Sequence, residues 1–319
     1  MYKLDYLWLD GYDVKNMRTK TRYLDGYELD MKDLPIWGFD GSSTLQAEGN
    51  NSDCVLEPIK LYKNPLDPMG MSHIVLCEVM NVDGTPHESN SRATLRSIIE
   101  DCGGIDKVKK DMKFGIEQEY VIFDKKTGRP SGWPANGFPP PQGRYYCGVG
   151  GDVVEHRELV EEHADMCNRV GIPVQGTNAE VMLSQWEYQV GPSNVLDICD
   201  HLWTARFVLE LLAEARGLYI ELDPKPVAGD WNGSGAHINF SSKFMREDAT
   251  IHDIQKLCID LGKYKDEMLN HYGKGNEDRL TGKHETAHID DYSWGVSDRS
   301  ASIRIPMSTA NKGRGHLED

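Results

Sequence analysis

The stretch KFGIEQEYVIF, residues 113–123, decides how the chain is interpreted, because two glutamates stand two residues apart within a run of apolar residues. In a β-strand, successive side chains point to opposite faces, so Glu117 and Glu119 share one face with Val121 and Phe123. Two neighbouring carboxylates repel each other, and one tends to be protonated unless a cation or an arginine neutralises them. The stretch therefore predicts either a cation site or a strand rim wetted by solvent.

The composition of the 319-residue chain excludes several classes of function. Its formal net charge of −16 opposes phosphate backbones and anionic membrane surfaces, so we expect neither nucleic acid nor a membrane as a partner. The seven cysteines are spread widely without a CxxC pair, which is typical of reduced thiols. No apolar run reaches 18 residues, and the N-terminal residues lack the order of a signal peptide, so we expect a soluble cytoplasmic protein.

Two regions differ in their expected secondary structure. Residues 1–88 contain short strands separated by turns, and an amphipathic helix follows from Ser89 to Gly103. We therefore place a domain boundary near residue 88, with the second domain over 89–319. Further helices are expected at 158–171, 195–216 and 253–269, and a long Gly/Pro-rich loop at 128–151. Strands mixed with helices, without strict alternation, favour an α+β fold with a mainly antiparallel sheet over a doubly wound nucleotide fold.

Further acidic residues belong to other strand-like segments. Glu180 and Glu187 are seven residues apart, so a turn near residues 183–185 is needed for both to face one side. With His237 in GSGAHINF, the chain offers four carboxylates and one imidazole on strands, and no thiolate nearby. Hard oxygen ligands in that number suit Mg²⁺ or Mn²⁺ better than zinc.

Three arginines near the C-terminal end provide a possible phosphate site. The chain contains neither a Walker A sequence nor G-x-G-x-x-G, so metal ions and arginines would have to hold the phosphates of ATP. Arg279, Arg299 and Arg304 present planar forks that match phosphate or carboxylate oxygens. The alternative is that these arginines form surface ion pairs.

The pentapeptide HETAH, residues 284–288, matches the H-E-x-x-H pattern of zinc metallopeptidases. That pattern works only on a helix, where both histidines share a face, and the flanking residues give no amphipathic helix of useful length. We therefore expect a loop here, and the peptidase interpretation would require tightly bound zinc.

Seven motifs make the sequence resemble glutamine synthetases of the eukaryotic-type class (type II) over nearly the whole chain. They are FDGSST (39–44), FGIEQEY (114–120), GTNAEVM (176–182), QWEYQVG (185–191), WNGSGAH (231–237), RLTGKHET (279–286) and RSASIRIP (299–306). The resemblance implies a small N-terminal β-grasp-like domain and a catalytic domain whose curved sheet is flanked by helices. It also implies a ligase that joins ammonia to the γ-carboxylate of L-glutamate through γ-glutamyl phosphate, with ATP as co-substrate.

The resemblance further implies a role for individual residues. Two or more divalent ions, Mg²⁺ or Mn²⁺, would bind at each site, held by two sets of ligands: Glu119, Glu180 and Glu187 for the first ion, and Glu117, His237 and Glu318 for the second. Glutamate would contact Asn232, Gly233 and Arg279. The nucleotide would contact Asn239 and Ser241, and its phosphates would contact Arg299 and Arg304.

Catalytic roles are implied for Asp40, Glu285 and Arg299. Glu285 would lie on a flap that closes over the intermediate, and Asp40 would accept a proton from ammonium. In this family Asp40 reaches the site of a neighbouring subunit, so the resemblance implies a homo-oligomer, usually a decamer of two pentameric rings, with active sites between subunits. Alternatives are a γ-glutamyl ligase that uses another amine and a catalytically silent structural relative.

The sequence departs from the family pattern at two places. Met307 stands where relatives commonly have a basic residue, which affects the expected phosphate environment. The sequence ends at Glu318 and Asp319, where family members continue with two arginines and a helical tail. If the chain is a fragment, we expect a folded, assembled protein with slow turnover, in which the second metal site and the glutamate site are weakened most.

Overall fold

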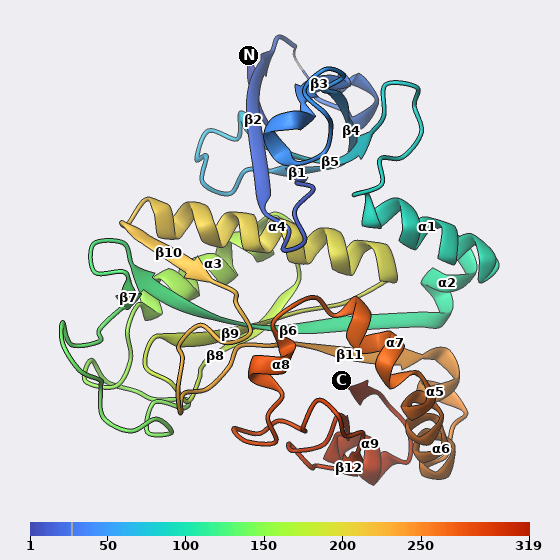
Figure 1. Ribbon diagram of the computed structural model, residues 1–319. Helices are drawn as coiled ribbons and strands as arrows, with labels where there is room; N and C mark the ends of the chain where they lie inside the picture. The colour runs from blue at the N-terminus through green and yellow to red at the C-terminus, as the bar shows by residue number, and fades with distance from the viewer. Residues whose placement is uncertain (27) are drawn as a thin grey trace. The chain divides into compact units, whose positions relative to one another are not determined.

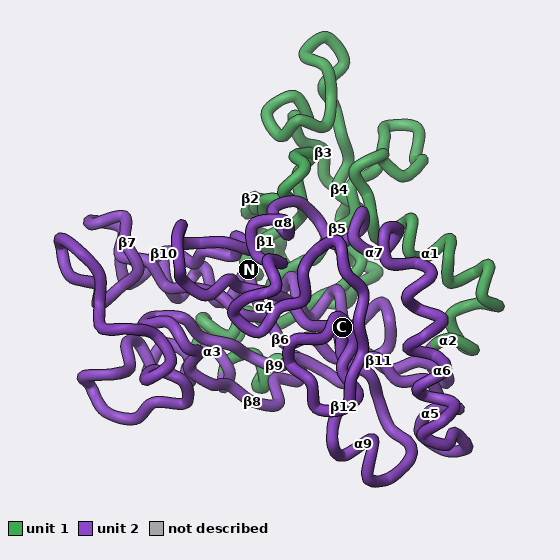
Figure 2. Tube along the Cα trace, turned by 60° about the horizontal axis from the view of Figure 1, so that its bottom comes forward, with its two compact units in different colours: residues 1–108, 166–171 green, residues 109–165, 172–319 purple. Residues whose placement is uncertain are grey.

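The computed structural model describes residues 1–26 and 28–319, and these residues form two compact units. Figure 1 shows the secondary-structure elements along the chain. The first unit comprises residues 1–108 and 166–171, and the second comprises residues 109–165 and 172–319, coloured green and purple in Figure 2. No helix within the described residues is long and apolar enough to cross a membrane.

The first unit is built on a mixed sheet of five strands within the described residues. Its order is β2-β1-β5-β4-β3, with β1 parallel to β5 and the other neighbours antiparallel. Alternate residues of β1, Leu4, Tyr6 and Trp8, point to one face and pack with Leu56 and Phe39. The elements of this unit are β1 (Tyr2–Leu9), β2 (Met17–Leu24), β3 (Trp37–Asp40), β4 (Asp53–Lys63), β5 (Ser72–Met80), 3₁₀ turns at Met31–Asp33 and Gly41–Thr44, and α1 (Ser91–Asp101).

The second unit is built on a larger sheet centred on β6. The path is β12-β13-β14-β11-β6-β9-β8, and β7 and β10 also pair with β6. Apart from the parallel pair β12 and β13, the pairings between these strands are antiparallel. The strands are β6 (Met112–Asp124), β7 (Arg129–Pro130), β8 (Val174–Ala179), β9 (Gln185–Ser193), β10 (Leu218–Glu221), β11 (Ala236–Ser242), β12 (Trp294–Val296), β13 (Ile303–Ile305) and β14 (Leu317–Glu318). The predicted α+β class with a mainly antiparallel sheet is confirmed.

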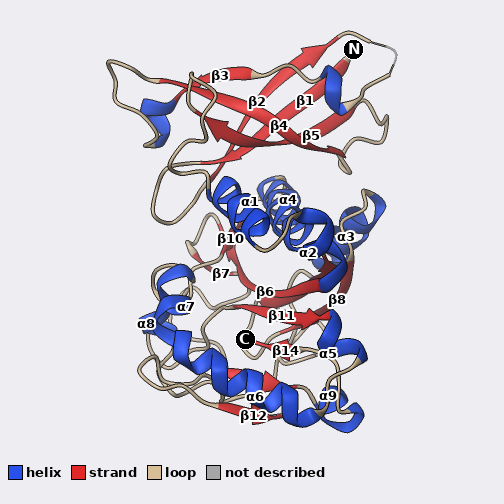
Figure 3. Ribbon diagram, turned by 90° about the vertical axis from the view of Figure 1, so that its right-hand side faces the viewer, coloured by secondary structure: helices blue, strands red, loops and turns tan. Residues whose placement is uncertain are grey.

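Helices flank this sheet. Helix α4 packs on β6, β9 and β10, and it begins where the side chain of Asn194 accepts hydrogen bonds from two backbone N–H groups. Figure 3 shows α5, α6 and α9 beside the β11, β12 and β14 end of the sheet. Beyond α1, the helices of the described residues are α2 (Ile105–Asp111), which begins in the first unit, α3 (Arg157–Arg169), which ends in it, α4 (Val195–Glu214), α5 (Lys243–Glu247), α6 (Ile251–Leu261), α7 (Lys265–His271), α8 (Asn276–Arg279) and α9 (Met307–Lys312).

The helix predicted over 253–269 is interrupted in the structure. A 3₁₀ turn at Gly262–Tyr264 separates α6 from α7. The ring of Tyr292 lies so close to Gly262 that a Cβ there would be 2.6 Å from the Cε1 atom of the ring. Glycine permits this approach and is a poor helix former, so tertiary packing ends α6 earlier than the periodicity indicates.

Candidate active site

The register of the central sheet brings the acidic residues of different strands together. Glu117 on β6 lies opposite His237 on β11 and opposite Gln189 on β9. Glu119 lies opposite Glu187 on β9. Residues directly opposite each other in antiparallel strands have Cβ atoms about 5 Å apart. The two glutamates of β6 therefore face two different sets of neighbours.

The first set forms at a tight hairpin between β8 and β9. Glu180 directly follows β8, and its N–H donates to the carbonyl of Gln185 at 2.9 Å. Ser184 adopts φ +73° inside this turn, in agreement with the turn predicted near residues 183–185. The candidate ligand atoms of Glu119, Glu180 and Glu187 lie within 4.8 Å of one another, and all three residues are buried.

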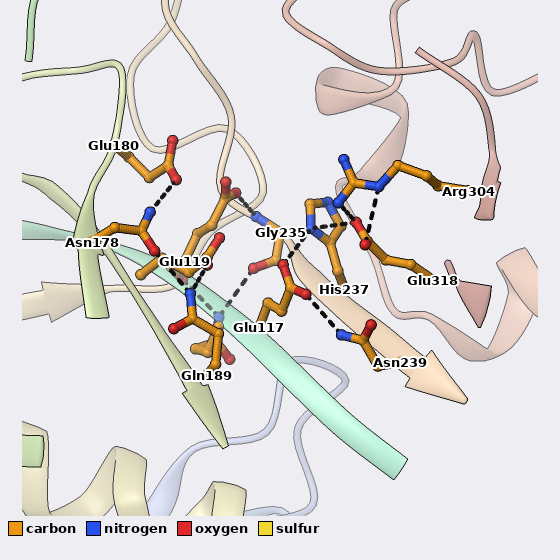
Figure 4. Close-up of polar contacts among 12 residues, drawn as sticks. Glu117, Glu119, Asn178, Glu180, Gln189, Gly235, His237, Asn239, Arg304 and Glu318 are labelled. Carbon is orange, nitrogen blue, oxygen red and sulfur yellow. Dashed lines mark hydrogen bonds and ion pairs between the residues drawn. The ribbon is translucent and has the colours of Figure 1, made fainter. Parts of the chain in front are cut away.

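The second set joins three strands. Glu318 on β14 lies opposite Asn239 of β11, and the candidate ligand atoms of Glu117, His237 and Glu318 lie within 4.8 Å of one another. The Nδ1 atom of His237 is 3.8 Å from Glu117 Oε2 and 3.9 Å from Glu318 Oε1. Figure 4 shows this set and, beside it, the side chains of Glu119 and Glu180 from the first set.

Backbone pairing holds Glu318 in place. The backbone of the next residue, Asp319, exchanges two hydrogen bonds with Ile238, of 2.7 and 3.1 Å. The side chain of Arg304 donates to Glu318 from Nε at 3.0 Å and also from Nη2. Glu318 is buried, with 8% of its surface exposed, and lies in an ordered strand.

The burial of these carboxyls changes their acidity. Burial and the neighbouring charges of Glu119 and Glu187 raise the pKa of Glu180 to about 8. Burial and the charges of Glu117 and Glu119 raise the pKa of Glu187 to about 7. Without a cation the first set therefore retains protons near neutral pH. A group of buried carboxylates that repel one another fits a divalent cation, because bound positive charge removes the repulsion.

In the second set, neighbouring groups shift the pKa values against the effect of burial. Burial alone would raise the pKa of Glu117, but the adjacent imidazole of His237 and a hydrogen bond from Asn239 outweigh burial and lower the pKa of this carboxyl below its ordinary value. The amide of Asn239 donates to Glu117 Oε1 at 2.8 Å. Burial alone would lower the pKa of His237. The adjacent carboxylate of Glu117 outweighs burial, so the pKa of His237 is raised. The donor sets contain oxygen and imidazole nitrogen and, within the described residues, no thiol.

Both sets line one cavity of about 750 Å³, together with many of the residues that the sequence predicted. Nη2 of Arg279 donates to His237 Nε2 at 3.1 Å. A Cβ at Gly233 would lie 2.7 Å from Cγ of Arg279, so glycine allows the arginine to approach the turn. The other predicted residues on the cavity wall are Asn232, Glu285, Arg299 and Arg304.

Three predicted residues are held by other hydrogen bonds. The amide of Asn239 is bonded to Glu117, and Ser241 donates to the carbonyl of Gly315 at 2.6 Å, so neither side chain lines the cavity. Asp40 ends β3 in the first unit and accepts hydrogen bonds from Ser42 and Ser43. The hydroxyl of Ser42, followed by that of Ser43, lowers the pKa of Asp40. Their roles at the nucleotide and at ammonium stay predictions.

The HETAH segment is a loop, as predicted. His284 and Glu285 adopt φ +56° and +61°, which is incompatible with a right-handed helix. The ring of His284 pairs with Asp230, at 2.9 Å, and the ring of His288 with Asp290, at 3.5 Å. The two histidines therefore have separate partners, and the geometry contradicts the zinc-peptidase interpretation.

Sequence reasoning missed the amides that support the first set. Asn178 donates to Glu180 Oε1 at 2.8 Å and accepts from Gln189 at 2.8 Å. Gln189 also donates to Glu187. Each amide stands two residues from a candidate ligand, Asn178 before Glu180 and Gln189 after Glu187. A search for polar residues at that spacing would have found them, because residues two apart on a strand share a face.

Comparisons with known proteins agree with the resemblance. Residues 88–257 match the family described as "Glutamine synthetase, catalytic domain". A glutamine synthetase of Streptomyces viridochromogenes is 49% identical over 100% of this chain and 91% of the relative. Glutamine synthetase 2 cytoplasmic of Drosophila melanogaster is 47% identical, covering 98% and 84%. Glutamine synthetase cytosolic isozyme 1-4 of Arabidopsis thaliana is 45% identical, covering 99% and 87%.

A solved structure supports the fold independently. The cryoEM structure of Plasmodium falciparum glutamine synthetase superimposes with a TM-score of 0.76 at 16% sequence identity, covering 99% of this chain and 67% of that chain. The family match extends over more than half of the chain, and the relatives from bacteria, animals and plants cover nearly all of it. The chain therefore belongs to the glutamine synthetase family, in its eukaryotic-type class.

Proposed function

We propose that the chain is a glutamate–ammonia ligase that forms glutamine, ADP and phosphate from L-glutamate, ammonia and ATP. The observation that carries this proposal is the cavity of about 750 Å³ in which five carboxylates, four of them buried, and His237 meet three arginines. Transfer of the γ-phosphoryl group of ATP to a carboxylate brings two anions together, so negative charge on both must be neutralised. Fixed arginines beside cation-binding carboxylates suit that requirement.

The two sets would each hold one divalent ion, Mg²⁺ or Mn²⁺. Glu119, Glu180 and Glu187 would hold the first ion, and Glu117, His237 and Glu318 the second. Bound there, the ions would supply positive charge to the phosphate oxygens. The task of the protein side chains is to keep that charge in fixed positions, which strands paired on both sides do better than loops.

The substrates would lie along the rest of the cavity. Glutamate would contact Asn232, Gly233 and Arg279, and Arg279 is already close to His237. Arg299 and Arg304 would face the phosphates, and Arg299 would act in catalysis. Met307 is 53% exposed where a basic residue is common in relatives, so it adds no charge to that environment. Asn239 and Ser241 would contact the nucleotide, which requires their present hydrogen bonds to be rearranged.

The second half-reaction needs ammonia and the exclusion of water. The nitrogen lone pair attacks the acyl carbon of γ-glutamyl phosphate, phosphate leaves, and ammonium must first give up a proton. We assign Asp40 to this step, because hydrogen bonds from hydroxyl groups keep its carboxylate ionised and able to attract ammonium. Glu285 would lie on the loop that shields the acyl phosphate from water.

We also propose how the protein is organised in the cell. Residues 1–88 would form the N-terminal domain and 89–319 the catalytic domain, in a decamer of two pentameric rings with active sites between subunits. The first unit exposes Val14, Ile36 and Leu45 to 66%, 62% and 62%, which an assembly would cover. The cytoplasm is the proposed location, and two similar relatives are named cytoplasmic and cytosolic. Light scattering coupled to gel filtration measures the particle mass.

A coupled assay tests the proposed reaction. Incubation with ATP, Mg²⁺ or Mn²⁺, glutamate and ammonium should release one phosphate for each glutamine formed. Parallel reactions with ethylamine or polyamines in place of ammonium identify the preferred amine. Phosphate release that ignores glutamate and ammonium would refute the proposal, and no turnover with any amine would indicate a silent relative.

A further inference from the structure

A chain of hydrogen bonds links the loop that carries Glu285 to the turn proposed for glutamate. The backbone N–H of Asn232 donates to Gln142 Oε1 at 2.9 Å. Nε2 of Gln142 lies 3.1 Å from Nδ1 of His284, and Nε2 of His284 lies 2.9 Å from an oxygen of Asp230. His284 is the residue directly before Glu285. The long Gly/Pro-rich loop thus takes part in the site through Gln142.

The direction of each hydrogen bond in this chain is determined. A backbone N–H can only donate, so the oxygen of the Gln142 amide faces Asn232 and its nitrogen faces His284. The amide nitrogen also can only donate, so Nδ1 of His284 accepts. The proton of the neutral ring is then on Nε2, from which it is donated to the carboxylate of Asp230. One tautomer of His284 satisfies all of these partners.

The glutamate turn at the other end of the chain is itself fixed. The buried side chain of Gln185 donates to the carbonyl of Gly233 at 2.7 Å and accepts from the side-chain amide of Asn232 at 3.3 Å. Gln185 is the first residue of β9. The turn is therefore anchored to the central sheet, and Gln142 transmits its position to His284.

The loop itself is strained at its tip. His284 and Glu285 are consecutive non-glycine residues in the left-handed region, which persists only where surrounding contacts hold it. The base is closed by a bridge between Thr281 and His288, and the hydroxyl of Thr286 contacts the carbonyl of Lys283 at 2.8 Å. The ring of His284 ties the tip to the neighbouring segments.

We propose that His284 is a positioning residue that holds Glu285 over the cavity and, through Gln142, couples this loop to the glutamate turn at Asn232. The inference rests on the proposed function, in which the loop shields γ-glutamyl phosphate from water. Glutamate that orders the turn would favour the shielding position of the loop, because Asn232, Gln142 and His284 are joined in series. Loss of the His284 ring should let water compete with ammonia.

The test measures phosphate released per glutamine formed. The wild-type ratio should be near one, and His284→Ala should raise it several-fold. The variant should also increase the KM for glutamate roughly tenfold, which is the effect of one lost polar contact, and leave the KM for ATP unchanged. His252→Ala is the matched control, because this histidine is exposed on α6 and is not among the residues that line the cavity, and its ratio should stay near one. His284→Gln offers one donor and one acceptor and should restore part of the coupling, whereas His284→Leu fills space and should not.

Two outcomes separate this inference from the proposed function. If the wild-type protein forms no glutamine, the proposed function is wrong and the inference fails with it. If the wild-type protein forms glutamine and His284→Ala keeps a ratio near one, only the inference is wrong. Should His284→Ala fail to fold, Gln142→Leu breaks the same link, since the leucine side chain can neither accept from the N–H of Asn232 nor donate to Nδ1 of His284. A ratio near one in that variant would also overturn the inference.

Discussion

Replacing Glu180 with glutamine should make the metal-free protein more stable at pH 8. Burial and two neighbouring carboxylates raise the pKa of Glu180 from 4.5 to about 8. Between these values the folded protein keeps the proton that the unfolded chain has released, so stability falls as the pH rises through about 8. The shift corresponds to on the order of 4–5 kcal/mol lost across that interval. Glu180→Gln keeps the shape and the contact with Asn178 but removes the ionisation.

Urea unfolding of the chelator-treated protein at pH 5 and pH 8 measures this effect. The variant should be close to the wild-type protein at pH 5 and more stable at pH 8, by an amount approaching the figure above. Added Mn²⁺ should stabilise the wild-type protein and have less effect on the variant, because a ligand that binds only the folded state shifts unfolding by mass action. Glu158→Gln, at an exposed position on α3, is the control. An equal difference between variant and wild type at both pH values would refute the reasoning.

Two further predictions concern the same cavity. Binding of Mn²⁺ at pH 7 should release protons and become tighter as the pH rises, because Glu180 and Glu187, with pKa values of about 8 and about 7, must ionise to bind the ion. Calorimetry in buffers of different ionisation enthalpy would show this proton release. Binding heats that do not depend on the buffer would contradict the prediction. Gly233→Ala should raise the KM for glutamate by roughly tenfold or more, because the new Cβ would lie 2.6 Å from the carbonyl oxygen of Pro224 and 2.7 Å from Cγ of Arg279, so the turn and the arginine must both shift. Gly151→Ala, where a Cβ meets open space, is the control for steady-state kinetics, and equal KM values for the two variants would exclude this explanation.

Local periodicity predicts part of the site. The alternation in residues 113–123 indicates β6 and places Glu117 and Glu119 on one face, since both depend only on the two-residue repeat of a strand. The turn between Glu180 and Glu187 follows from the same rule. The apolar pattern likewise predicts α4, whose inward residues pack on the sheet.

Tertiary contacts between distant segments cannot be predicted in this way. The approach of Tyr292 to Gly262, which interrupts a predicted helix, joins residues that no local repeat connects. The contact between Gln142 and His284 spans 142 positions. Arg279 meets His237 only because the short helix α8 ends beside β11. For the candidate metal ligands, the family resemblance supplied the grouping that spacing alone left open.

Glu117 and Glu119 lie on one continuous strand, so β6 fixes the distance between them. Two residues along a strand are about 7 Å apart, a length set by covalent geometry rather than by side-chain packing. Changes in the surrounding loops therefore leave the separation of the two acidic groups intact. A deletion of Gln118 would instead turn Glu119 to the opposite face of the sheet, which would remove its carboxylate from the first set. The distance between the two central acids therefore depends on the number of residues between them.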